Sequence, residues 1–324
     1  VVQILAKGSF RLLRTALHSV VRGRMSSTFP VPHLANPLSY ETYLFDADGV
    51  LWRANEAVPG AVRFVKELLE MGKRVYIVTN NSTNTTEEYM KKVTKLGFET
   101  LHEANIISPN VVMVDYLRRH QQYMEKGRVY AIASGGVVDT LQKELGVECI
   151  GEGPDHVPLN STFLNSVDVS KEVSAVVVGY DPHFSYNKIM KAANYLLDPS
   201  CGFFITNEDA TFPGSRKDIV VPGTGSITAS IRAVALPRQP IVFGKPGEEL
   251  QRFLKESLDL KPEQTIMLGD RLDTDISFGN RMGVATCWMR TGVHKEDDVK
   301  RAIEAKDTDL IPTCTFSFEE FYAS

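Results

Sequence analysis

Two carboxylates stand two residues apart where an apolar segment meets a glycine. Residues 43–45 are apolar, Asp46 follows them directly, and Asp48 and Gly49 come next. An extended strand would send the two carboxylates to opposite faces, but a turn at Gly49 can gather both, with main-chain N–H groups, in one anion-binding concavity. A carboxylate ionised at neutral pH can attack phosphorus, and a second one can move the proton. We therefore predict Asp46 as a nucleophile and Asp48 as a general acid and base, with Gly49 at the phosphate.

Three further apolar segments end in polar residues. They are residues 75–78 before Thr79, Asn80 and Asn81, residues 241–244 before Lys245, and residues 265–269 before Asp270 and Asp275. Short buried-type strands followed by helical patterns predict a parallel α/β sheet. Because ligands bind beyond the carboxyl ends of such strands, we expect these polar residues to converge. Thr79, Asn80 and Asn81 would donate hydrogen bonds to a phosphate, and Lys245 would supply positive charge.

The acidic cluster is of the kind that Mg²⁺ prefers. We predict that Mg²⁺ is held by Asp46, Asp270 and the main-chain carbonyl of Asp48. Magnesium keeps several waters, and either Asp275 or Asp273 is placed to hold one of them.

The four segments in this order resemble the haloacid dehalogenase-like phosphatase superfamily. Longer matches at residues 45–52, 79–82, 178–186 and 269–276 are similar to the eukaryotic phosphoglycolate phosphatase, pyridoxal phosphatase and 4-nitrophenylphosphatase family, over roughly residues 38 to 320. The resemblance implies a doubly wound, Rossmann-like parallel sheet with an inserted α/β cap domain, and hydrolysis of small phosphorylated metabolites through an aspartyl-phosphate. It also implies that Asp270 binds the metal directly, whereas Asp275 interacts with it only through other groups. It further implies that the protein is a homodimer formed through the cap.

The spacing of the four segments predicts the domain division. Asp46 and Thr79 are 33 residues apart and Lys245 and Asp270 are 25 apart, each near one βαβ unit, whereas 166 residues separate Thr79 from Lys245. We therefore predict core segments at 38–117 and 237–324 around a cap at 118–236. Strands are expected in this insert at residues 128–133, 175–179 and 203–206. A cap of this kind excludes water and contacts the substrate.

Composition is that of a soluble globular enzyme. The 324 residues are 43% hydrophobic and 23% charged, and the net charge of −4 disfavours nucleic acid as a partner. The four cysteines lie far apart without CxxC spacing, so neither a zinc site nor a disulfide framework is expected. No apolar run is long enough to span a membrane.

Residues 1–37 form a separate extension. Its first thirty residues contain no acid and place basic side chains on one helical face, as in a mitochondrial transit peptide. The other interpretation is a dispensable extension with translation starting at Met25. We predict a cytoplasmic product, with mitochondrial import through the basic segment as the alternative.

The cap loop at residues 206–214 is expected to overhang the pocket, so Asp209 and Phe212 are candidate specificity residues. In the pyridoxal branch the resembling loop carries a histidine near the pocket, and Phe212 matches that position. Loss of this polar contact favours 2-phosphoglycolate over pyridoxal 5′-phosphate as substrate. His183 is a further candidate near the substrate, although a hydrogen-bonded loop position fits it better than a catalytic base.

Two other functions stay open. The fold could serve as a catalytically silent regulator or scaffold, against which the intact set of Asp46, Asp48, Thr79, Lys245 and Asp270 argues. The protein could instead transfer the phosphoryl group from Asp46 to a second acceptor, which only product analysis separates from hydrolysis.

Overall fold

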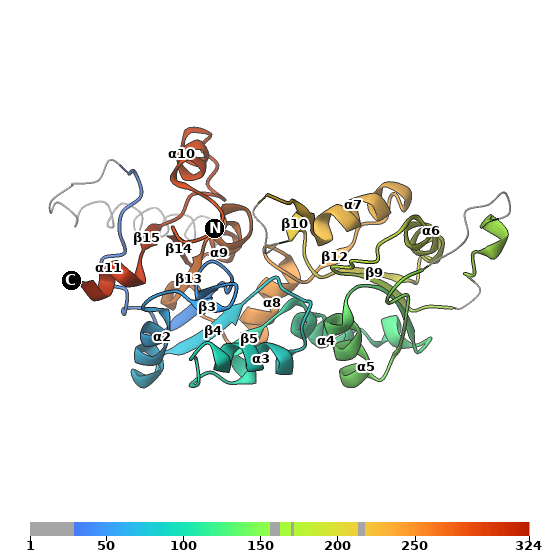
Figure 1. Cartoon of the computed structure of the whole chain (residues 1–324), viewed down its shortest axis with the longest axis horizontal. Helices are drawn as coiled ribbons and strands as arrows, with labels where there is room; N and C mark the ends of the chain where they lie inside the picture. Colours follow the sequence, from blue (N-terminus) through green and yellow to red (C-terminus); the bar gives the residue numbers. More distant parts are fainter. Residues whose placement is uncertain (1–28, 156–162, 170–171, 213–217, 324) are drawn as a thin grey trace, which may run out of the picture.

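The structure is a computed structural model that describes residues 29–155, 163–169, 172–212 and 218–323 (Figure 1). Most of the N-terminal extension, including the basic segment interpreted as a targeting signal, lies outside the described residues. Among the helices that are described, none is long and apolar enough to cross a membrane.

A six-stranded parallel sheet forms one half of the molecule, in the order β15-β14-β13-β1-β4-β5. Its strands are β1 (Thr42–Phe45), β4 (Arg74–Val78), β5 (Ile106–Ile107), β13 (Thr265–Gly269), β14 (Ala285–Met289) and β15 (Cys314–Phe316). The central strand β1 is buried on both faces and lies between β13 and β4, with Leu44 opposite Met267 on one side and Tyr76 on the other. This arrangement confirms the predicted parallel α/β fold.

Helices cover both faces of this sheet. The helices are α2 (Ala61–Glu70), α3 (Thr86–Lys95) and α11 (Phe318–Ala323) on one face, and α4 (Pro109–Arg119), α8 (Glu248–Ser257) and α9 (Ser277–Met282) on the other. Helix α2 buries Ala61, Phe64, Val65 and Leu68, the spacing of a single helical face. Helix α3 begins at a capping box in which Thr85 and Glu88 satisfy each other's main-chain N–H groups.

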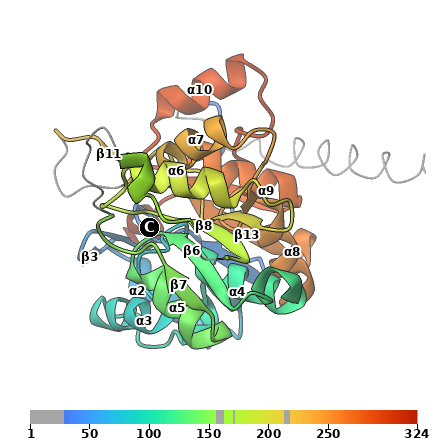
Figure 2. The same ribbon diagram turned by 90° about the vertical axis from the view of Figure 1, so that its right-hand side faces the viewer.

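A second parallel sheet of five strands forms the other half, in the order β12-β9-β8-β6-β7. Its strands are β6 (Arg128–Ile132), β7 (Glu148–Ile150), β8 (Ala175–Val178), β9 (Gly202–Ile205) and β12 (Ile241–Val242), and its helices are α5 (Gly135–Leu145), α6 (Tyr186–Tyr195) and α7 (Thr224–Val234). Viewed from the end of the molecule that carries the second sheet, α6 and α7 lie on one face of this sheet and α5 lies on the other (Figure 2). The three strands predicted within the insert are present.

Strand β12 corrects one prediction. We expected residues 241–244 to form a buried strand of the same sheet as β1, but Ile241 and Val242 are half-buried and pair with Phe204 and Ile205 of β9. The chain therefore leaves the second sheet only after the position predicted as the end of the cap at residue 236. The domain boundaries themselves stay a prediction.

Short elements complete the chain. They are the antiparallel pairs β2 (Trp52–Arg53) with β3 (Glu56–Ala57) and β10 (Thr211–Phe212) with β11 (Val221–Pro222), the helix α10 (Glu296–Glu304), and single turns at Glu103–Asn105, Gln121–Met124, Phe163–Ser166, Pro262–Gln264 and Leu272–Ile276.

The two halves share one apolar core. Leu44 and Met267 of the first sheet belong to the same buried cluster as Val177 and Phe204 of the second sheet. The buried amide of Asn110 in α4 lies at this junction and donates to the main-chain carbonyls of Ser82 and Gly136, at 3.1 and 3.2 Å. This contact fixes the loop that follows β4 against the start of α5 in the second half.

The second half contains an ion pair with no contact to solvent, and its removal tests what it contributes to stability. The side chains of Lys188 and Asp181 are 0% and 1% exposed and hydrogen-bond to each other. Replacing Lys188 by Met leaves a buried carboxylate without its cation, so we expect the free energy of unfolding to fall by about 3 to 5 kcal/mol in urea denaturation. The double variant Lys188→Met, Asp181→Leu should recover about half of this loss or more. A single variant within about 1 kcal/mol of the parent would contradict the assignment.

Candidate active site

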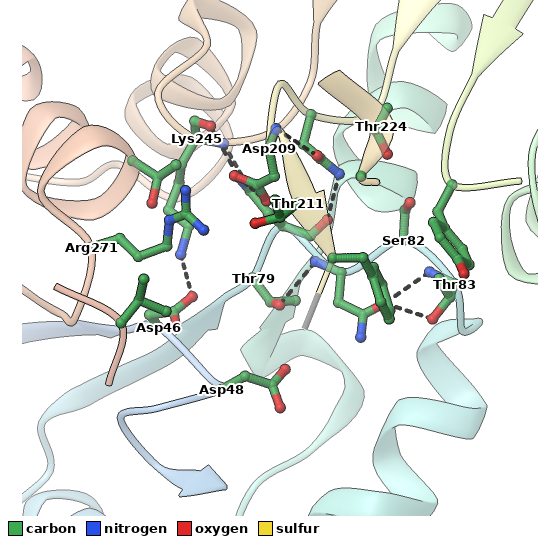
Figure 3. A pocket seen from close by; sticks show the side chains of 18 of the residues that line it. Asp46, Asp48, Thr79, Ser82, Thr83, Asp209, Thr211, Thr224, Lys245 and Arg271 are labelled. Carbon is green, nitrogen blue, oxygen red and sulfur yellow. Dashed lines mark hydrogen bonds and ion pairs between the residues drawn. The ribbon is translucent and has the colours of Figure 1, made fainter. Parts of the chain in front are cut away.

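A cavity of about 270 Å³ lies where the two halves meet (Figure 3). Asp46, Asp48, Thr79, Lys245 and Asp270 all line it. The structure thus brings together the polar ends of β1, β4 and β13, as expected for parallel strands, and the lysine that follows β12 reaches them from the second sheet.

The lysine is the centre of this group. Lys245 is 1% exposed, and its Nζ lies 2.5 Å from Asp46 Oδ1, 2.8 Å from Asp275 Oδ1 and 2.5 Å from the main-chain oxygen of Val78. The contacts with Asp46 and Val78 are hydrogen bonds, and the contact with Asp275 is an ion pair. Lys245 therefore fixes the carboxylate predicted as the nucleophile.

Asp270 and Asp275 are held by main-chain donors. Asp275 Oδ2 accepts from the N–H groups of Asp270 and Arg271, at 3.1 and 3.0 Å, within a π-helical turn that starts at Leu272. Asp270 Oδ2 accepts from Val293 N at 2.6 Å. A side chain on Gly292 would approach this oxygen to 1.7 Å, so only glycine lets the loop close over Asp270.

Burial raises the pKa of two of these carboxyl groups. The pKa of Asp46 lies well above its usual range because of burial, with further upward contributions from Asp275 and Asp270, and Lys245 opposes the rise. Burial and Asp275 raise the pKa of Asp270 to about 7. Both groups would therefore ionise more readily with additional positive charge beside them.

The geometry fits a divalent cation at this point. Oxygens of Asp46, Asp270 and Asp275 lie within 4.8 Å of one another, and Asp270 Oδ1 is buried without a hydrogen-bond partner. A buried carboxylate oxygen without a donor is suited to Mg²⁺. Asp275 Oδ1 is likewise buried without a hydrogen bond, but Asp275 Oδ2 accepts from two main-chain N–H groups, so Asp46 and Asp270 are the better ligands. A role for the main-chain carbonyl of Asp48 stays a prediction.

Asp48 lies beside the cavity with one oxygen occupied. Its Oδ1 accepts from Trp52 Nε1 at 2.9 Å, and the ammonium of Lys92 in α3 lies 3.4 Å from the same oxygen. Trp52 is fully buried, so this contact fixes the orientation of the carboxyl group. The other oxygen, Oδ2, is left to exchange a proton with a bound molecule.

Of the two amides predicted as phosphate donors, Asn80 has other partners for its N–H groups, whereas the side chain of Asn81 is engaged through its oxygen. Asn80 Nδ2 donates to Asp209 Oδ2 at 3.3 Å and to the main-chain oxygen of Lys245 at 3.1 Å, while its Oδ1 accepts from Lys245 N at 2.7 Å. Asn81 Oδ1 accepts from both the N–H and the hydroxyl of Thr83. Asn80 therefore joins the loops around the site, although both amides line the cavity. The hydroxyl of Thr79 accepts from Asn81 N and stays free to donate.

Gly49 does not occupy its predicted position. Its N–H donates to the main-chain oxygen of Trp52 at 2.7 Å, and Gly49 is not among the residues that line the cavity. The glycine is needed for another reason: its φ is +93°, and a Cβ there would lie 2.8 Å from Asp270 Oδ2. The turn brings Asp46 and Asp48 together as expected, but the N–H group of Gly49 is not available to a phosphate.

The second half supplies the opposite wall. Asp209, with a pKa raised by burial, and Phe212 both line the cavity, as predicted for the cap loop. The ring of Phe212 stacks on Tyr180, with centroids 4.4 Å apart at 20°. His183 is exposed and lies outside the cavity, where its N–H donates to Asp181 Oδ1. His183 thus occupies the hydrogen-bonded loop position that the sequence favoured, and Tyr180 of the same segment, rather than His183, lines the cavity.

Sequence reasoning also missed Lys92, Arg271 and Thr224, which line the cavity as well. Arg271 and Tyr180 follow strands of the two sheets, so the rule that placed Asp46 at a strand end could have found both. Lys92 carries no such signal, because it lies in the middle of a helix with many charges.

Comparison with known proteins agrees with this site. The family model of haloacid dehalogenase-like hydrolases matches residues 43–148, and a second model, described as HAD-hydrolase-like, matches residues 242–314. A mouse protein named glycerol-3-phosphate phosphatase is 37% identical over 266 residues, which are 80% of this chain and 82% of that protein. The chain belongs to the haloacid dehalogenase-like hydrolases. The family predicted from the four motifs is thus confirmed.

Two further similarities define the extent of the match. A Caenorhabditis elegans protein named as a NipSnap protein is 48% identical over 248 residues, or 76% of this chain, and the match spans only 47% of that longer protein. The structure of a p-nitrophenyl phosphatase from Archaeoglobus fulgidus superimposes with a TM-score of 0.72 at 25% identity, covering 88% of this chain and 99% of that one. Both sheets of this fold therefore recur in a solved relative.

Replacing Asp270 tests the assignment of the metal ligands. Because Asp270 Oδ1 is buried without a donor, the change Asp270→Asn should weaken Mg²⁺ binding by at least about 10-fold in isothermal titration calorimetry. Asp273 in the same acidic cluster is half-exposed and pairs with Arg271, so Asp273→Asn is the matched control and should stay within about 2-fold. Equal losses in the two variants would show that the cluster attracts the cation only through its total charge.

Proposed function

We propose that this protein is a magnesium-dependent phosphatase that hydrolyses small phosphate monoesters through an aspartyl-phosphate on Asp46. The observation that carries the proposal is the buried ammonium of Lys245, which holds the Asp46 carboxylate beside Asp270 at the carboxyl end of β1. Family membership and the phosphatases among the relatives support a phosphoric monoester hydrolase.

In the first step an Asp46 oxygen attacks phosphorus. A bond forms between this oxygen and phosphorus while the bond from phosphorus to the leaving oxygen breaks. Asp48, oriented by Trp52, gives its proton to the leaving oxygen, so that an alcohol departs rather than an alkoxide. Thr79 offers a hydroxyl donor and Lys245 offers positive charge to the phosphoryl oxygens.

In the second step Asp48, now ionised, removes a proton from water as the water attacks phosphorus. The bond between phosphorus and the Asp46 oxygen breaks, which releases inorganic phosphate and restores both carboxyl groups. Asp46 and Asp270 would hold Mg²⁺, which when bound neutralises charge on the carboxylates and on the phosphoryl group.

For the substrate we propose 2-phosphoglycolate. Phe212, at the cap-loop position compared with the pyridoxal branch, lines the cavity and offers no hydrogen bond to a pyridine nitrogen. Pyridoxal 5′-phosphate is therefore the weaker candidate. Glycerol 3-phosphate is a second candidate, because the mouse relative is named for it.

The change Asp46→Asn tests the covalent route. The amide is a poor nucleophile and removes a negative charge from the metal site, so we expect kcat/KM to fall by several orders of magnitude. Turnover of 4-nitrophenyl phosphate with Mg²⁺ measures it, and unchanged thermal unfolding shows that the variant folds. More than about a tenth of the parent rate would reject the aspartyl-phosphate route. A parent protein that binds Mg²⁺ but turns over no monoester would instead favour the silent regulator, and transfer to an added acceptor would favour a phosphotransferase.

The change Phe212→His tests the choice of substrate. The parent protein should prefer 2-phosphoglycolate to pyridoxal 5′-phosphate in kcat/KM. The variant should raise the value for pyridoxal 5′-phosphate by up to about 10-fold, as expected for one added hydrogen bond of about 1 kcal/mol. Turnover of 4-nitrophenyl phosphate serves as the control and should change little. A parent protein that already favours pyridoxal 5′-phosphate would overturn the assignment.

A further inference from the structure

Three cationic side chains line the cavity, Lys92, Lys245 and Arg271, and they differ in how the protein holds them. Lys245 hydrogen-bonds to Asp46 and to the carbonyl of Val78 and forms an ion pair with Asp275. The guanidinium of Arg271 forms a two-pronged ion pair with Asp273, at 3.1 and 2.8 Å. A bound molecule would have to compete with these partners for either cation.

The third cation, Lys92, has N–H groups for which no acceptor is found among the described residues. Its Nζ lies 3.4 Å from Asp48 Oδ1, at the long end of a hydrogen bond, and that oxygen already accepts from Trp52 Nε1 at 2.9 Å. The ammonium also lies 5.0 Å from the centre of the Trp52 ring. An ammonium has three N–H groups, and in the described part of the chain Asp48 is the single hydrogen-bond acceptor found for Lys92.

The place of Lys92 in the cavity is defined by its helix. Tyr89 and Val93 are buried beneath α3, which turns Lys92 toward the loop that carries Asp48. The side chain is 28% exposed, compared with 1% for Lys245. The packing of α3 therefore positions the ammonium, which remains accessible from the cavity.

Because Lys92 lies next to Asp48, its ammonium can contact the part of a substrate that lies near Asp48. Asp48 protonates the leaving oxygen, so the atoms bonded to that oxygen must lie close to Asp48 during the reaction. A group one or two carbons from the leaving oxygen then comes within reach of Lys92. The leaving group, rather than the transferred phosphoryl group, is the part of the substrate that Lys92 faces.

We propose that Lys92 binds a carboxylate carried by the leaving group, so that the preferred substrates are phosphate esters of short hydroxy acids. The proposal rests on the function proposed above and defines its substrate class. The cavity is already lined by Asp46, Asp48, Asp209 and Asp270, so a substrate that brings a carboxylate as well as a phosphate needs a cation on the side of its leaving group. Lys92 is placed to form an ion pair with that carboxylate, whereas an ester with a neutral leaving group would form no ion pair with it.

The experiment compares two esters that differ at one group. 2-Phosphoglycolate carries a carboxylate where 2-hydroxyethyl phosphate carries a neutral CH₂OH group. Lys92→Met removes the charge with little change of shape, and Lys92→Arg restores a cation. Lys91→Met is the matched control, because Lys91 is the adjacent lysine, is exposed and pairs with Glu87 on the outer side of α3.

We expect Lys92→Met to raise KM for 2-phosphoglycolate by roughly 10- to 100-fold, the range for loss of a charged hydrogen bond, with little change in kcat. KM for 2-hydroxyethyl phosphate should stay within about 2-fold. Lys92→Arg should recover most of the loss, and Lys91→Met should behave as the parent. Thermal unfolding of each variant checks that the fold is intact.

Other results overturn the proposal. An equal fall of kcat on both esters would mean that Lys92 acts only through Asp48, and an unchanged KM for 2-phosphoglycolate would mean that it contacts no carboxylate. A parent protein that prefers 2-hydroxyethyl phosphate would refute the substrate class while leaving the phosphatase function standing. A parent protein that hydrolyses neither ester nor 4-nitrophenyl phosphate would refute the proposed function itself.

Discussion

The active site depends on one buried ammonium. Lys245 comes from the end of a strand in the second sheet, yet its three partners belong to the first: a carboxylate after β1, a carboxylate of the turn after β13, and a carbonyl at the end of β4. Taking this charge out of water is costly, and only good geometry with all three partners repays it. These contacts therefore define one position for the Lys245 ammonium. Through it, the two sheets are fixed relative to each other at the active site.

The loop that delivers Lys245 is positioned by Asn80. The side chain of Asn80 binds both the N–H and the carbonyl of Lys245, and the main-chain oxygen of Asn80 accepts from Asn207 of the second half. Gly244 has no room for a side chain, since a Cβ would lie 2.6 Å from Asn80 Oδ1. An amide that we expected to bind phosphate instead joins three loops. In the proposed mechanism Asn80 would act through the placement of Lys245.

The sequence allowed the site to be predicted wherever a strand end determined the position. Asp46, Thr79 and Asp270 follow buried strands of one parallel sheet, and the geometry of that sheet brings them together. The prediction failed where main-chain hydrogen bonds decided the outcome. The N–H of Gly49 is used by Trp52, and β12 pairs with β9 rather than with the sheet that carries Asp46. His183 and Tyr180 belong to one loop, of which Tyr180 lines the cavity, while the main-chain N–H of His183 donates to Asp181, the partner of Lys188.

The arrangement around Asp48 shows why specificity need not come from the cap loop alone. Trp52 donates to one oxygen of Asp48 and orients the carboxyl group, so in the proposed mechanism the proton would be delivered from a fixed point. A fixed proton donor also fixes the leaving oxygen, and with it the direction in which the rest of the substrate extends. Helix α3 then supplies a cation on that path, while Phe212 and Tyr180 close the opposite wall. Discrimination among small phosphate esters would thus arise between two walls, one from each half of the molecule, with the reacting phosphorus held between them.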